Sequence, residues 1–142
     1  MQVNLSSHVG EIVENLGKTQ FAESRAVILG GTTPSVFMSS ERAELCEKIV
    51  AELVSNSLKH GVSSRTDGEV KVNIESLYGS EIMIEVTDNG VGLPENFSLD
   101  APTNHGLKMV KELVSKLGGK LRVKNEHGTS FIINFTDSEF SH

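Results

Sequence analysis

Two stretches of strict apolar–polar alternation, Glu69–Glu75 and Glu81–Thr87, constrain the fold of this chain most. Every second position in them is a branched aliphatic residue: Val70, Val72, Ile74, Ile82, Ile84 and Val86. Because successive side chains of a strand point to opposite faces, both stretches predict strands with one buried face. Only a short turn separates them, so we expect an antiparallel pair.

Apolar residues at helical spacing predict three helices, the second capped by Ser39 or Ser40 and ended by Gly61. The helices are expected at 4–18, 41–59 and 107–117, and further strands at 25–29, 35–38, 121–125 and 129–135. Short turns join the strand pairs. The pattern therefore favours an α+β, two-layer sandwich, with helices on one face of a mixed, mostly antiparallel sheet.

The size and charge of the chain narrow the class of protein. A length of 142 residues with 37% hydrophobic residues suits one domain with a core. A formal net charge of −6 argues against a general nucleic-acid binder. No apolar run is long enough to cross a bilayer, so we expect no membrane contact by this segment. The single cysteine, Cys46, excludes an internal disulfide and fits a cytoplasmic location.

The second predicted helix carries polar residues at the margin of its apolar arc. Glu52, Asn56 and Lys59 fall within roughly 60° of one another around the helix axis. A carboxylate, a carboxamide and an amine in this arrangement could line a cleft. On an isolated helix, a solvated edge explains the same pattern equally well.

Asp88 ends a predicted strand and is followed by the turn sequence Asn-Gly-Val-Gly-Leu. Its carboxylate should lie at the rim of the core, where it can accept a hydrogen bond from an exocyclic amine such as that of adenine. Gly90 and Gly92 let the backbone turn without a Cβ in the path of a ligand. Leu93 adds apolar surface on which a base could lie. An ordinary hairpin turn is the alternative.

Two further glycines stand at the starts of later elements. Gly106 opens the third predicted helix, and the N–H groups at a helix N-terminus favour phosphate. Gly128 precedes the hydroxyl of Thr129 at a hairpin. Each signal is weak when it is taken alone.

Together, four segments in this order resemble the ATP-binding domain of sensor histidine kinases, in the GHKL superfamily with the Bergerat fold. They correspond to an N box and three glycine boxes: Glu52–His60, Asp88–Gly92, Gly106–Val110 and Gly128–Phe131. The residues around Lys59 and Lys108 most resemble those of the subclass with a short ATP lid, here residues 95–104.

The resemblance implies ATP and Mg²⁺ as ligands, with Asn56 on the metal and Glu52 polarising the attacking nucleophile. Lys59 would contact the phosphates, while His60 would stack or pack near the nucleotide. On the base side, Asp88 would hold the adenine amine, supported by Thr129. The remaining residues implied at the nucleotide are Gly90, Gly92, Leu93, His105, Gly106 and Leu107.

The same resemblance implies a kinase that transfers the γ-phosphate of ATP to a histidine on dimerisation helices. A response regulator would then receive the phosphoryl group from this histidine. His8 lacks the charged neighbours that usually follow an acceptor histidine. We therefore expect residues 1–20 to be the tail of that helical hairpin or a linker, 21–137 the catalytic domain and 138–142 a tail. The full-length protein could be a homodimer.

Two alternatives stay open at this point. An anti-sigma-factor-type serine kinase has the same fold and phosphorylates a protein serine. A nucleotide-binding regulatory module without phosphotransfer would also fit, since the second glycine box holds only Gly106.

Overall fold

The computed structural model describes residues 2–18, 25–29, 36–61, 68–76, 80–93, 98–99, 105–125 and 128–137. The helices are α1 (Leu5–Lys18), α2 (Ser40–Asn56) and α3 (His105–Leu117), with a π-helical turn at Ser57–Gly61. The strands are β1 (Gln2–Asn4), β2 (Arg25–Leu29), β3 (Phe37–Ser39), β4 (Gly68–Ser76), β5 (Glu81–Asp88), β6 (Lys120–Lys124) and β7 (Thr129–Thr136). Most of the predicted lid and the predicted C-terminal tail lie outside the described residues.

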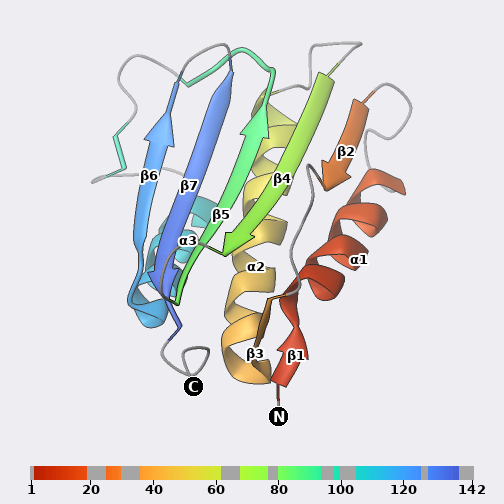
Figure 1. The fold of residues 1–142 in the computed structure, drawn as a ribbon. Coiled ribbons are helices and arrows are strands. Elements are labelled where there is room, and N and C mark those ends of the chain that lie inside the picture. The colour runs from red at the N-terminus through yellow and green to blue at the C-terminus, as the bar shows by residue number, and fades with distance from the viewer. Residues whose placement is uncertain are drawn as a thin grey trace.

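The main sheet has five strands in the order β2-β4-β5-β7-β6. The β2–β4 pair is parallel and the other three pairs are antiparallel. All three helices lie behind one face of this sheet (Figure 1), and β1 pairs with β3 in a separate two-stranded ribbon. The predicted α+β sandwich with a mixed, mostly antiparallel sheet is confirmed.

The second helix begins where the sequence predicts but ends differently. Ser39 is the N-cap, and its Oγ accepts a hydrogen bond from the Arg42 N–H at 3.3 Å. The expected α-helix to residue 59 instead widens at Ser57 into the π-helical turn that ends at Gly61. In this turn Ser57 and Leu58 are buried and Lys59 is exposed.

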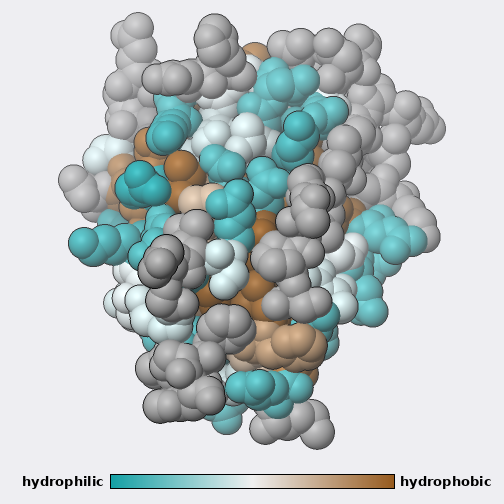
Figure 2. Space-filling model, in the orientation of Figure 1, coloured by the Kyte–Doolittle hydropathy of each residue, from teal (hydrophilic) through white to brown (hydrophobic). Residues whose placement is uncertain are grey.

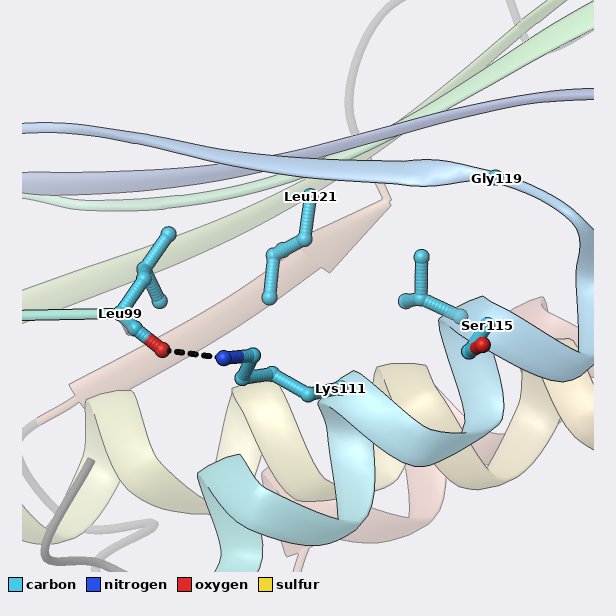
Figure 3. A pocket seen from close by; sticks show the side chains of 6 residues that line it. Leu99, Lys111, Ser115, Gly119 and Leu121 are labelled. Carbon is cyan, nitrogen blue, oxygen red and sulfur yellow. Dashed lines mark hydrogen bonds between the residues drawn. The ribbon is translucent and has the colours of Figure 1, made fainter. Parts of the chain in front are cut away.

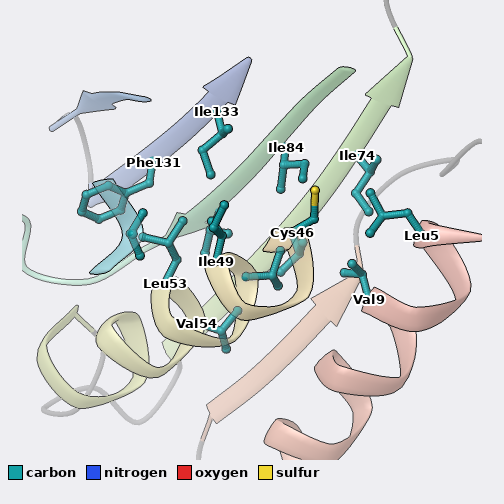
Figure 4. Close-up of a cluster of buried hydrophobic side chains, with 14 of the residues drawn as sticks. Leu5, Val9, Cys46, Ile49, Leu53, Val54, Ile74, Ile84, Phe131 and Ile133 are labelled. Carbon is teal, nitrogen blue, oxygen red and sulfur yellow. The ribbon is translucent and has the colours of Figure 1, made fainter. Parts of the chain in front are cut away.

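The core lies between the sheet and the helices (Figure 4). Cys46, Ile49 and Leu53 of α2 face Ile84 of β5 and Ile133 of β7, and all five side chains are fully buried. Helix α1 adds Leu5, Val9 and Val13 to the same cluster. Because each fully buried aliphatic side chain contributes about 1.5–3 kcal/mol, this layer dominates the stability of the fold.

A buried ion pair joins three elements at the end of the sandwich where α2 starts. The Arg42 Nε lies 3.2 Å from the Asp137 Oδ1, and Asp137 is fully buried just after β7. The Arg42 Nη2 also donates to the Leu117 and Thr136 carbonyl oxygens, each at 3.3 Å. One guanidinium therefore connects α2 with the ends of α3 and β7.

Candidate functional site

Asp88 and Thr129 are brought together by the pairing of β5 with β7. They are register partners at the end of this pair, and each side chain is only 4% exposed. The Gly90 N–H donates to the Asp88 Oδ1 at 2.9 Å. Among the described residues, this is the hydrogen bond recorded on the Asp88 carboxylate.

Gly128 is required by the close approach of the chain to Asp88. Its φ is +119°, and a Cβ at this position would overlap the Asp88 carbonyl oxygen. Any larger residue would push the hairpin away from the strand end. The predicted role of Gly128 as a structural hairpin glycine agrees with this geometry.

The turn after Asp88 is held from both sides. The Asn89 Oδ1 accepts from the Glu69 N–H at 2.8 Å, which ties the turn to the start of β4. On the other side, the Asn125 Oδ1 accepts from the Leu93 N–H at 3.0 Å, and the Asn125 Nδ2 donates to the Leu93 carbonyl at 3.3 Å. Gly92 has a φ of +81°, and a Cβ there would come within 2.6 Å of the Asn125 Oδ1.

Asn125 was not predicted from the sequence as part of the site. It follows β6 directly and reads as an ordinary turn residue. The one signal in the sequence is its place in the Asn-Glu-His-Gly hairpin. Its two hydrogen bonds to Leu93 span 32 residues and depend on the β5–β7–β6 order of the sheet.

The C-terminal end of α2 lies at the same end of the sandwich as the end of β5 (Figure 1), and this part of the helix carries Glu52 and Asn56. Glu52 and Asn56 are half-buried, Lys59 is exposed, and the side chain of His60 lies outside the described residues. The π-helical turn that carries Lys59 contacts β5, the strand that ends at Asp88. The catalytic and metal-binding roles assigned to these residues stay predictions.

Helix α3 points its N-terminus toward this end of the molecule. It is joined through Gly118-Gly119 to β6, whose first residue, Lys120, pairs with Asn134 near the far end of β7. At its start, His105 is exposed, Gly106 is half-buried and Leu107 is buried in the core. The side chain of Leu107 therefore packs inward, which leaves only its backbone for the phosphate contact that the sequence predicts.

Three other observations concern the possible nucleophile, metal site and cavity among the described residues. Burial raises the pKa of the Cys46 thiol to about 12, so Cys46 is not a thiolate nucleophile at neutral pH. Among the described residues, no three His, Cys, Asp or Glu side chains are grouped to hold a metal ion. A cavity of about 310 Å³ lies away from Asp88, between α3 and β6.

Residues 41–139 match the family described as histidine kinase-, DNA gyrase B-, and HSP90-like ATPase. Because this match covers most of the chain, the chain belongs to this ATPase family. The fold agrees with the histidine kinase domain of the Erythrobacter litoralis EL346 blue-light activated histidine kinase, with a TM-score of 0.89 and 26% identity. That comparison covers 98% of this chain and 64% of the other.

Two curated relatives show similarity over parts of the chain. Blue-light-activated histidine kinase 2 of Erythrobacter litoralis is 34% identical over 86 residues, which is 61% of this chain and 25% of that protein. An anti-sigma F factor of Clostridium botulinum is 44% identical over 46 residues, 32% of either chain. The matched regions therefore span about a quarter to a third of these relatives' lengths.

Proposed function

We propose that this chain is the ATP-binding catalytic domain of a two-component sensor histidine kinase. It would transfer the γ-phosphate of ATP to a histidine on a separate dimerisation domain. The observation that carries this proposal is the buried Asp88 carboxylate, which lies beside Thr129 at a strand end in a member of the ATPase family.

The base side of the proposed site is the better defined. Asp88 Oδ2 would accept a hydrogen bond from the adenine amine, and Thr129 would support that contact directly or through a water molecule. The backbone from Gly90 to Leu93, held in place by Asn125, would border the base. A carboxylate that can only accept would favour an amino-substituted purine over one with a carbonyl group.

On the phosphate side, the proposed roles rest on the resemblance to the N box, and the contact of the Ser57–Gly61 turn with β5 supports them. Asn56 would bind Mg²⁺, Glu52 would polarise the attacking nucleophile, and Lys59 would contact the phosphates. When bound with ATP, Mg²⁺ supplies charge neutralisation during phosphoryl transfer. The backbone N–H groups of Gly106 and Leu107 would face the phosphates at the start of α3.

The rest of the proposal concerns the whole protein. Residues 1–20 would lead from the acceptor hairpin, and a response regulator would receive the phosphoryl group in the cytoplasm. Within this chain, α1 packs on α2 through buried side chains, and the Leu5 N–H donates to the Val36 carbonyl at 2.7 Å. No helix among the described residues combines the length and hydrophobicity needed to span a bilayer.

Nucleotide binding can be tested with a fluorescent ATP analogue and Mg²⁺. We expect Asp88→Asn to weaken binding roughly 10- to 100-fold, because the amide presents a donor to the adenine amine. Glu75→Gln is a matched control, since it makes the same chemical change on the exposed part of β4. An undetectable affinity of the native chain, or equal binding by both variants, would refute the proposed site.

The match to an anti-sigma F factor favours a second candidate, a serine protein kinase. A phosphotransfer assay distinguishes the histidine kinase from the serine kinase. The chain would be incubated with radiolabelled ATP and either an acceptor helical hairpin or a serine-bearing antagonist protein. Phosphohistidine is labile in acid, whereas phosphoserine is stable, so acid treatment identifies the product. ATP binding without transfer to either protein would indicate a regulatory module.

A further inference from the structure

The positive charge of this acidic chain is concentrated in one short segment. Six of its 13 lysine and arginine residues lie between residues 105 and 125, together with a single acidic residue, Glu112. They lie on α3 and on the neighbouring strand β6: Lys108, Lys111, Lys116, Lys120, Arg122 and Lys124. We refer to α3 and β6 together as the basic edge.

β6 is the outermost strand of the sheet at this edge. Within the described chain it pairs with β7 alone, so the backbone N–H and C=O groups on its other side have no strand partner. Lys120, Arg122 and Lys124 are exposed, whereas Leu121 and Val123 alternate with them and are half-buried against the helical layer. Arg122 leans across the sheet, where its Nη2 donates to the Asn134 Oδ1 at 3.2 Å.

In the view from the open face of the sheet, hydrophilic side chains border the molecule on the side of β6 (Figure 2). In the described part of the chain, Lys120 and Lys124 form no ion pair. Lysine on an edge strand commonly protects against aggregation, so charge alone does not define a docking surface.

A groove beside β6 provides an independent observation. It has a volume of about 310 Å³ and is lined by Leu99, Lys111, Val114, Ser115, Gly119 and Leu121. Leu99 lies shortly before α3 in the chain, and the Lys111 Nζ donates to the Leu99 carbonyl oxygen at 2.6 Å (Figure 3). The groove therefore already accommodates an apolar side chain together with a main-chain carbonyl.

We infer that the basic edge is a docking surface for an extended acidic polypeptide segment, added as a strand to the free side of β6. Its acidic side chains, at every second position, would face Lys120, Arg122 and Lys124. The intervening apolar side chains would face Leu121 and the groove. Alternation of this kind follows from the two-residue period of a strand, and the main-chain hydrogen bonds would add affinity.

A polypeptide fits these observations better than another polyanion. The β6 backbone groups that have no strand partner among the described residues match the hydrogen-bonding spacing of a peptide strand, and the groove offers apolar surface to side chains. The remainder of the chain is strongly acidic, so a nucleic acid or a charged membrane extending beyond the basic edge would be repelled. This inference does not depend on the proposed kinase activity.

Binding can be measured by fluorescence anisotropy with the native chain and no nucleotide. The probe is a labelled peptide of about seven residues with glutamate and valine in alternation. Its controls are a peptide with the same composition but the glutamates in one block, and one with lysine in place of glutamate. We expect the alternating acidic peptide to bind at least about tenfold more tightly than either control.

A pair of matched variants locates the site. Lys120→Glu/Lys124→Glu should weaken binding of the alternating peptide at least about tenfold. Lys48→Glu/Lys71→Glu makes the same charge change at exposed positions elsewhere and should leave binding unchanged. In NMR spectra, the backbone amides of Lys120–Lys124 should shift on titration, and both variants should still bind the ATP analogue.

Several outcomes would overturn the inference: equal binding of the block peptide, equal loss in both double variants, or peptide-induced shifts confined to residues outside α3 and β6. Tighter binding of a single-stranded DNA oligonucleotide or of phosphatidylglycerol vesicles would assign the surface to those anions instead. Sedimentation that depends on concentration and is abolished by Lys120→Glu/Lys124→Glu would assign it to a second copy of the chain.

Discussion

Asp88 and Thr129 face each other as the terminal register pair of β5 and β7, and both side chains are buried although both are polar. A carboxylate and a hydroxyl withdrawn from water at a strand end need polar partners there. Among the described residues, the Gly90 N–H donates a hydrogen bond to Asp88. The proposed adenine amine would supply another.

If Thr129 supports the nucleotide through its hydroxyl, the identity of that group matters more than its shape. Thr129→Val should weaken binding of the ATP analogue about tenfold, because a methyl group of similar volume replaces the hydroxyl. Thr129→Ser keeps the hydroxyl and should bind within about threefold of the native chain. Both affinities can be read by fluorescence titration, and equal affinities for the two variants would remove Thr129 from the site.

Replacing Gly128 should damage the fold as well as the site. Gly128→Ala places a methyl group on the Asp88 carbonyl oxygen and should lower the free energy of unfolding by at least about 2 kcal/mol. Gly118→Ala is the control: its φ is +73°, but its Cβ would meet nothing within 4 Å. It should cost only about 1 kcal/mol. Urea unfolding measures both, and similar costs would contradict the predicted overlap.

Asn125 should act on nucleotide affinity through the turn that it holds. Asn125→Ala removes both hydrogen bonds to Leu93, so we expect the Kd for the ATP analogue to rise about fivefold. Asn134→Ala removes two comparable bonds, to Arg122 and Glu81, on the open face of the sheet. That variant should lose stability without losing affinity. A Kd unchanged by Asn125→Ala would show that the turn needs no such support.

The Arg42–Asp137 pair should behave as a coupled unit. Arg42→Met leaves the Asp137 carboxylate buried without its cation and should cost about 3 kcal/mol. Asp137→Leu alone leaves the Arg42 guanidinium without its carboxylate partner. The double variant removes both charges and should cost clearly less than the sum of the two single variants. A double-mutant cycle by urea unfolding measures the coupling, expected at roughly 1–3 kcal/mol. Additive costs would mean that the pair contributes no interaction of its own.

The buried Cys46 thiol should make the protein less stable in alkali. Burial raises its pKa to about 12 from the ordinary value of 9.0, so above pH 9 the unfolded chain loses this proton more readily than the folded one. Its contribution to stability is complete below pH 9 and declines as the pH rises toward 12. The free energy of unfolding of Cys46→Ala should therefore depend less on pH over this range. If the free energy of unfolding fell equally steeply with pH in the native chain and in Cys46→Ala, the raised pKa of Cys46 would be contradicted.

Much of the fold could be read from local patterns, because the periods of strands and helices are visible in the chain itself. The alternation from Val70 to Ile74 and from Ile82 to Val86 predicted β4 and β5. The spacing of buried residues along α3 predicted that helix. The widened turn at Ser57–Gly61 could not be read in this way, since the apolar spacing of α2 continues unbroken through Leu58.

The sequence by itself determined the residue types of the site, and its order of motifs indicated an ATP-binding family that the comparison with known proteins then confirmed. Only the tertiary structure decided which distant residues meet: Thr129 against Asp88, and Asn125 on Leu93. The physical reason is that sheet order and register bring together positions far apart in the chain. No local periodicity encodes that pairing.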